Sequence, residues 1–138
     1  MNNSYNIYYT SNFTEIKCLD VLLEEVLGII TNGSFLEIGA YDGITNSKTY
    51  QLANIGWQGV YVEPIEEYAT ICKKNHSNNN VQVICAAITD KDQKQTIYKG
   101  KLASTLLEDN KKAISASSSK KGGKFTFTTE EVKTFSWD

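Results

Sequence analysis

FLEIGAYDG, residues 35–43, is the stretch that decides the fold. Residues 34–38 form a short apolar run typical of a buried strand, and Gly39 and Gly43 bracket a tight turn after it. Residues 46–55 then have the composition of a helix. A strand that passes through a glycine-rich turn into a helix predicts an α/β unit with a ligand site at the carboxyl end of the strand.

The same alternation continues on both sides of this stretch. Residues 14–31 carry apolar side chains at spacings of three and four, which predicts a helix that ends at Asn32-Gly33. After the stretch come a predicted strand at 59–62, a helix at 65–75 and a strand at 81–85. Continuously apolar strands that alternate with helices indicate a mostly parallel sheet, covered by helices on both faces.

The character of the chain changes after Asp90. Thr96 to Tyr98 is a candidate short strand, and the low-complexity stretch SASSSKKGGK, 115–124, is expected to be a mobile loop. Residues 125–135 are expected to form a C-terminal hairpin with its turn at 129–131. The alternating pattern therefore covers the first two-thirds of the chain only.

Composition places the chain among single globular domains. Its 138 residues are 41% hydrophobic and 22% charged, which argues against a disordered or fibrous chain. The N-terminus lacks the layout of a signal peptide, and no apolar run approaches the roughly 20 residues of a membrane span. The net charge is −2 and arginine is absent, so a nucleic-acid surface is not expected. We expect one domain over residues 1–138.

The three cysteines, Cys18, Cys72 and Cys85, fit neither a disulfide framework nor a zinc spacing. They are expected to be buried thiols in a reducing cytoplasm, and no metal site is expected. The single histidine, His76, is expected near a helix C-terminus, where a cation is favourable, and without a catalytic role.

The charges around the turn indicate which ligand would fit. Glu63 ends the second strand, 20 residues beyond Gly43, where an acidic residue binds ribose hydroxyls. The turn reads G-x-x-x-G rather than G-x-G-x-x-G, and Tyr41 would crowd a pyrophosphate. Glu37, Asp42 and Glu63 would also repel a phosphate. S-adenosylmethionine, which has an adenosine, a sulfonium and an ammonium but no phosphate, fits this description.

These segments resemble the FkbM-type methyltransferases, a branch of the S-adenosylmethionine-dependent enzymes. The resemblance lies in FLEIGAYDG, in Ser47 to Thr49, in GWQGVYVEP (56–64) and in CAAITD (85–90). It covers a cofactor-binding core of roughly residues 30–108. It implies a Rossmann-like class I methyltransferase fold and O-methylation of a hydroxyl on a sugar, a lipid-linked glycan or another small metabolite.

The resemblance also implies roles for individual residues. Glu37 would lie near the ammonium of the cofactor, Glu63 would take the ribose hydroxyls, and Cys85 would border the adenine. Asp42 has the alternative role of capping the following helix. No catalytic residue is identified. The implied cofactor-binding set comprises two strand-end carboxylates, the glycine turn and the ends of the second and third strands: Glu37, Gly39, Ala40, Tyr41, Asp42, Gly43, Glu63, Pro64, Cys85 and Ala86.

One departure from the family pattern concerns the acceptor. The family has a further strand that ends in a D-x-E-G-type motif near the methyl group, and nothing in residues 91–138 matches it. The domain is therefore expected to be truncated or minimal, and the alternative is a non-catalytic cofactor-binding module without the acceptor half. A nicotinamide-dependent oxidoreductase is a second alternative, against which Tyr41 and Asp42 argue.

The expected strand order also bears on assembly. Strand 35–38 would have one unpaired edge, and such edges recruit other strands. We expect a second copy of the chain to pair there and form a homodimer. The alternative is that Val132 to Phe135 folds back into this place, where Lys133 would fit poorly in a buried position.

Overall fold

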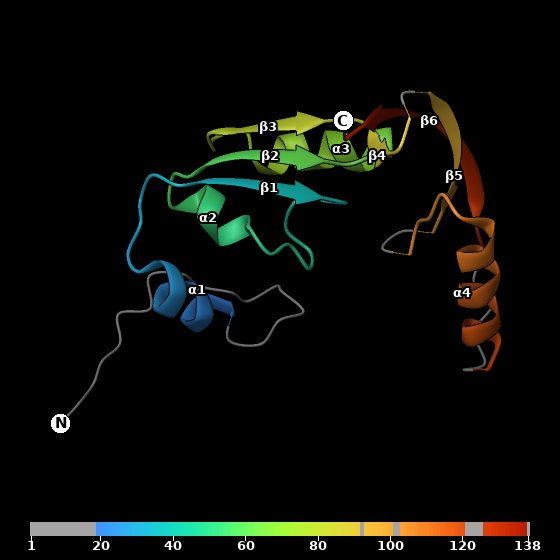
Figure 1. Cartoon of the computed structure of the whole chain (residues 1–138), viewed down its shortest axis with the longest axis horizontal. Coiled ribbons are helices and arrows are strands. Elements are labelled where there is room, and N and C mark those ends of the chain that lie inside the picture. The colour runs from blue at the N-terminus through green and yellow to red at the C-terminus, as the bar shows by residue number, and fades with distance from the viewer. Residues whose placement is uncertain (1–18, 92, 101–102, 121–125, 138) are drawn as a thin grey trace.

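The computed structural model describes residues 19–91, 93–100, 103–120 and 126–137 (Figure 1). These residues form two small sheets with helices between and beside the strands. In chain order the elements are α1 (Leu19–Leu27), β1 (Ser34–Ile38), α2 (Tyr50–Asn54), β2 (Gln58–Val62), α3 (Glu66–Asn75), β3 (Val81–Ile84), β4 (Ala87–Thr89), β5 (Lys94–Lys99), α4 (Glu108–Lys120) and β6 (Thr128–Ser136).

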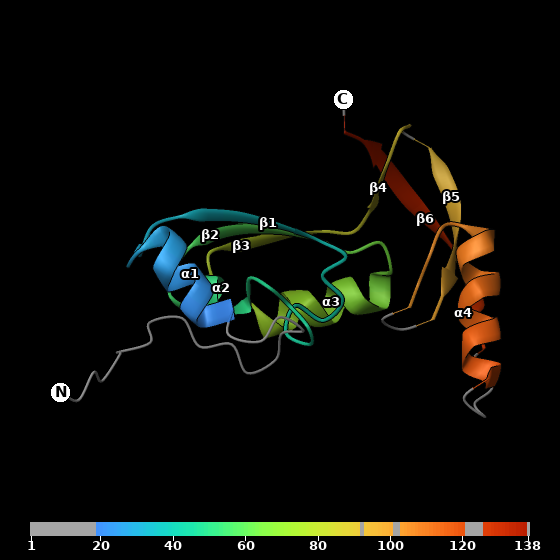
Figure 2. The ribbon, with the colours of Figure 1, turned by 60° about the horizontal axis from the view of Figure 1, so that its bottom comes forward.

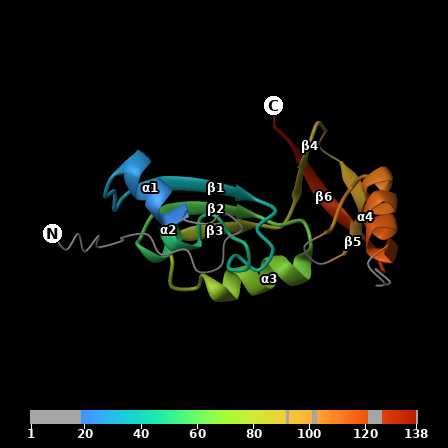
Figure 3. The same cartoon turned by 90° about the horizontal axis from the view of Figure 1, so that it is seen from below.

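The first sheet is parallel, as the alternating pattern predicts, with the order β1-β2-β3. Figures 2 and 3 show α1, α2 and α3 on one face of it. Phe35 and Tyr61 face these helices and pack edge to face, with ring centroids 5.2 Å apart. The expectation of helices on both faces is wrong for the described residues, since Leu36 and Ile38 on the other face are 47% and 52% exposed.

Two predicted helices are shorter in the structure, for identifiable reasons. The first ends at Leu27, because Gly28 takes a φ of 69° and its N–H closes the last turn on the Glu24 carbonyl. The second begins at Tyr50 rather than at residue 46, because Asn46 has a φ of 59°, which no helix allows. The third helix begins one residue later than predicted and ends at the predicted residue.

The second sheet has the order β4-β6-β5, and β6 runs parallel to β4 and antiparallel to β5. The predicted hairpin at 125–135 is wrong, because residues 129–131 continue one long strand instead of turning. Their charges fit that strand: Glu131 pairs with Lys94 of β5 at 2.8 Å. The alternative that Val132 to Phe135 folds back beside β1 is also wrong, since these residues lie in β6, which pairs with β4 and β5.

The low-complexity segment is helical where the structure describes it. Residues 115–120 form the end of α4, and 121–124 lie outside the described residues. The negative charges of Glu108 and Asp109 in the first turn stabilise the N-terminus of the helix, and both carboxylates lie near the ammonium of Lys112. The serine-rich composition hid these signals, so the prediction of a loop is wrong for this part.

The second sheet lies beyond the carboxyl ends of the first sheet's strands (Figure 3). It packs on the beginning of α3 through Ile65 and Tyr68, which form a buried cluster with Ala87, Ile97 and Val132. Tyr41 of the glycine turn packs against the same cluster. The second sheet therefore contacts the segment in which the sequence places the ligand site. None of the described helices has the length and apolarity to cross a membrane.

Candidate functional site

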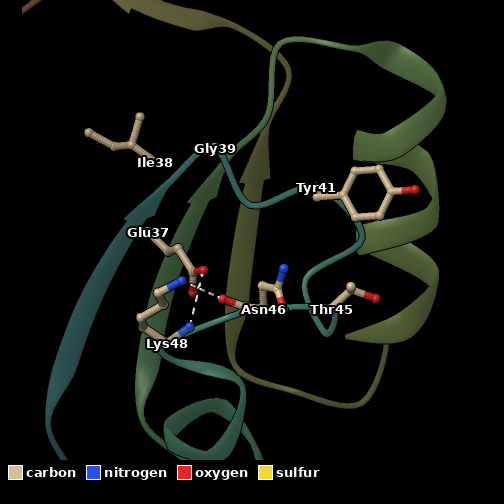
Figure 4. Close-up of a pocket in the computed structure, with 7 residues that line it drawn as sticks. All are labelled: Glu37, Ile38, Gly39, Tyr41, Thr45, Asn46 and Lys48. Carbon is tan, nitrogen blue, oxygen red and sulfur yellow. Dashed lines mark hydrogen bonds between the residues drawn. The ribbon is translucent and has the colours of Figure 1, made fainter. Parts of the chain in front are cut away.

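A cavity of about 400 Å³ lies at the carboxyl end of β1 (Figure 4). This is the edge of a parallel sheet where ligands of α/β proteins bind. Its lining comes from the end of β1, the glycine turn and the loop that leads to α2: Glu37, Ile38, Gly39, Tyr41, Thr45, Asn46 and Lys48. Three of the sequence-predicted residues, Glu37, Gly39 and Tyr41, therefore lie together on one cavity.

The glycine turn has a backbone that few residues adopt. Gly39, Tyr41 and Gly43 have φ values of 77°, 54° and 73°. The Gly39 and Ala40 N–H groups both donate to the Val62 carbonyl, at 2.8 and 3.1 Å, which ties the turn to the end of β2. A Cβ on Gly39 would meet nothing within 4 Å. Gly39 is thus required by its backbone angle and leaves open space beside the cavity.

Glu37 organises the loop on the other side of the cavity. Its Oε2 accepts hydrogen bonds from the Ser47 hydroxyl at 2.7 Å and from the Thr49 N–H and hydroxyl. Its Oε1 accepts from the Lys48 N–H at 3.3 Å. The carboxylate therefore fixes residues 47–49, of which Lys48 lines the cavity, and its Oε1 retains capacity for a cationic ligand.

Glu63 joins the end of β2 to the glycine turn. Its Oε2 accepts from the Tyr41 N–H and its Oε1 from the Ile65 N–H, both at 2.9 Å. The residue is 5% exposed, and this burial raises the pKa of its carboxyl. Glu63 thus stabilises the left-handed backbone at Tyr41, and each carboxylate oxygen keeps a second lone pair.

Asp42 has the hydrogen bonds of a local cap. Its Oδ1 accepts from the N–H groups of Ile44 and Thr45 at 2.9 and 2.7 Å, and its Oδ2 accepts from the Thr45 hydroxyl at 2.7 Å. This geometry caps the loop itself. The alternative that Asp42 caps the following helix is wrong, because α2 begins only at Tyr50 and has Thr49 as its N-cap. Its carboxylate closes the loop and is not among the groups that line the cavity.

The residues after β2 and β3 form a separate group. Cys85 Sγ lies 3.7 Å from the Pro64 carbonyl oxygen, and Ala86 is fully buried. Cys85 is exposed, so the expectation of a buried thiol is wrong for it, while Cys72 is buried and Cys18 lies outside the described residues. Pro64, Cys85 and Ala86 do not line the cavity.

Sequence reasoning missed several residues of the site. Lys48 lines the cavity, and its Nζ donates to the Asn46 carbonyl at 2.8 Å. The Ser47-x-Thr49 spacing was a signal for the Glu37 contacts, but no pattern marked Lys48. His76 is 3% exposed and its Nε2 lies 2.8 Å from the Gly43 carbonyl oxygen, so it is a buried partner of the turn.

Among the residues that the structure describes, no group of three or more His, Cys, Asp or Glu side chains could hold a metal ion. The arrangement instead offers a strained glycine turn, a strand-end carboxylate behind it and a cavity with one carboxylate and one ammonium. The cavity thus offers a ligand one negative and one positive side chain.

Comparison with protein families identifies the family of the chain. The Methyltransferase FkbM domain matches residues 37–138, which include the glycine turn, Glu63 and both sheets from the end of β1 onward. No curated protein and no solved structure matched the chain. Because the matched region spans well over half of the sequence, the chain belongs to the FkbM methyltransferase domain family.

Proposed function

We propose that the chain binds S-adenosylmethionine in the cavity at the end of β1. The observation that carries this proposal is the link between Glu63 and the Tyr41 N–H at 2.9 Å, which brings the strand-end acid against the glycine turn. In nucleotide-binding α/β folds these two parts hold the ribose and the adjoining chain of the ligand. Glu63 would take a ribose hydroxyl on the lone pairs that its backbone partners leave free.

The charges of the cavity support a cofactor with an amino-acid end. Glu37 offers a carboxylate to the ammonium, and Lys48 offers an ammonium to the carboxylate of the methionine group. The Lys48 and Glu37 side chains lie on the same wall of the cavity (Figure 4). A diphosphate would meet the carboxylate of Glu37 instead, which disfavours a nicotinamide dinucleotide.

Bound S-adenosylmethionine supplies an electrophilic methyl group on its sulfonium. The part of the enzyme that this chain provides is positioning: the turn and Glu63 fix the nucleoside, and Glu37 and Lys48 fix the methionine end. We propose that the acceptor is a hydroxyl of a sugar, a lipid-linked glycan or another small metabolite. The described residues identify no base for that hydroxyl.

A thermal-shift titration with S-adenosylhomocysteine tests the proposal. A ligand that binds only the native state raises the melting temperature, so millimolar ligand should stabilise the protein. Glu63→Gln should reduce the shift, because the amide nitrogen cannot accept a hydrogen bond from a backbone N–H. Glu25→Gln on the exposed side of α1 is the matched control and should leave the shift unchanged. A folded wild-type protein without any shift would refute the proposal.

Two assays separate the alternatives. Cofactor binding without a methylated product from any hydroxyl acceptor would favour a non-catalytic binding module. Calorimetric binding of NAD in place of S-adenosylhomocysteine would favour an oxidoreductase.

We also propose a cytoplasmic location and a homodimer that pairs through β1. Cys85 is an exposed free thiol, which suits a reducing compartment. Within the described ranges, only β2 pairs with β1, so the outer edge of β1 is open for a second copy.

A further inference from the structure

The end of α3 contacts the glycine turn at residues other than the one that Glu63 contacts. The Asn75 Nδ2 donates to the Asp42 carbonyl and the His76 Nε2 lies against the Gly43 carbonyl, both at 2.8 Å. These two consecutive residues end the helix and contact two consecutive carbonyls, 33 positions earlier in the chain. The contact therefore fixes the orientation of two peptide units in the turn.

The chemistry of the contact defines the state of His76. A carbonyl oxygen only accepts hydrogen bonds, so the Nε2 must carry a proton and donate it to Gly43. The ring is buried beside Tyr61, with ring centroids 4.6 Å apart. The Nδ1 is buried and has no hydrogen-bond partner among the described residues. A buried ring that leaves one nitrogen unpaired carries a cost, which the bond to Gly43 and the packing on Tyr61 offset.

The position of Gly43 requires glycine because of this contact with α3 rather than because of a ligand. A Cβ at this position would lie 2.7 Å from both the Cys72 Sγ and the His76 Nε2, too close for either atom. Glycine therefore allows α3 to reach the turn. The two glycines of the motif have different tasks, since Gly39 borders open space and Gly43 borders α3.

The turn needs such support because its backbone is strained. Tyr41 has a φ of 54°, a conformation that costs a bulky residue free energy and persists only when its surroundings hold it. Glu63 holds the Tyr41 N–H, and Tyr68 packs against the Tyr41 ring with centroids 4.5 Å apart. The end of α3 holds the other half of the turn, at Asp42 and Gly43.

We propose that Asn75 and His76 are positioning residues of the cofactor site. They hold the glycine turn in its binding shape before the ligand arrives, so that binding does not have to order it. The proposal rests on the proposed function in one respect, because ligand affinity is one of its two readouts. The other readout, the exchange of the turn's amide hydrogens, needs no ligand.

Four variants test this role. Asn75→Ala removes an exposed donor and leaves the core intact, and Asn78→Ala is its matched control in the following turn. His76→Phe keeps a ring on Tyr61 but removes the donor, whereas His76→Gln can restore a donor at similar reach. Isothermal titration with S-adenosylhomocysteine should show an affinity about fivefold to tenfold lower for Asn75→Ala and His76→Phe, the effect of one lost hydrogen bond.

The conservative variant and the control make the result specific. His76→Gln should bind within about twofold of the wild type, and Asn78→Ala should bind like the wild type. In the free protein, the amides of Gly43 and Ile44 should exchange faster in Asn75→Ala than in Asn78→Ala. Equal weakening by His76→Phe and His76→Gln, or unchanged affinity and exchange in Asn75→Ala, would overturn the proposal.

Failure of the proposed function gives a different pattern. If the wild-type protein binds no S-adenosylhomocysteine, the cofactor assignment is wrong, and the exchange rates still decide whether α3 holds the turn. If His76→Phe does not fold, Asn75→Ala carries both readouts.

Discussion

Alanine at the two glycines of the turn should have opposite main effects. Gly39→Ala places a methyl group in the open space beside the cavity, and Gly43→Ala places one against Cys72 and His76. We therefore expect Gly39→Ala to reduce mainly cofactor binding and Gly43→Ala to reduce mainly stability.

The expected magnitudes follow from the local geometry. Both glycines have a φ above 70°, where a side chain costs about 1–2 kcal/mol. Gly39→Ala should cost no more than this, because its Cβ meets nothing within 4 Å. Gly43→Ala adds two contacts at 2.7 Å, and overpacking of this kind costs about 1–3 kcal/mol. Its total should be about 2–5 kcal/mol of unfolding free energy.

Urea denaturation followed by circular dichroism gives the two unfolding free energies, and titration calorimetry with S-adenosylhomocysteine gives the affinities. Gly39→Ala should bind on the order of tenfold more weakly, the effect of 1.4 kcal/mol of steric cost. Equal losses of stability would refute the different surroundings of the two glycines. Unchanged affinity in Gly39→Ala would refute the placement of the ligand beside Gly39.

Three further predictions concern ionisation, reactivity and assembly. Burial raises the pKa of Glu63 above 4.5, so part of the wild-type unfolding free energy should be lost as the pH rises from 4.5. Denaturation of Glu63→Gln between pH 4.5 and 7 should not show this loss. Equal dependence of the two unfolding free energies on pH would contradict the raised pKa. Burial raises the pKa of the Cys72 thiol to about 12, so iodoacetamide at pH 8 should modify Cys85 and leave Cys72 unmodified in the folded protein. Mass spectrometry measures the modification of each cysteine, and equal modification would show that Cys72 is accessible. Light scattering after size exclusion should give a dimer, and a monomer at all concentrations would exclude pairing through β1.

The order of elements in the first half of the chain was predictable because each signal is local. The apolar run at 34–38 and the charges at the ends of α3 depend on neighbours in sequence alone. The single strand β6 was not predictable in this way. Glu130 and Glu131 resemble a turn until their partners are known, and those partners, Lys99 and Lys94, lie 31 and 37 residues earlier.

The candidate site likewise has parts that the sequence predicts and parts that it does not. The glycine turn and Glu63 could be predicted, because their spacing follows from the geometry of a strand, a turn and the next strand. The contacts of His76 with Gly43 could not, since the Asn-rich segment around His76 gives no sign of burial. Asp42 was open to both readings, because a carboxylate two residues before an N–H caps a loop as readily as it binds a ligand.

The most direct test of the cofactor assignment is a titration of the isotope-labelled protein with S-adenosylhomocysteine, followed by two-dimensional NMR of the backbone amides. The turn amides of Gly39, Ala40 and Tyr41, and the amide of Lys48 across the cavity, should shift and saturate together, because the ligand would lie between them. Saturating ligand that leaves these amides unchanged, or that shifts only the amides at the opposite end of the sheet near Gln58, would contradict the assignment.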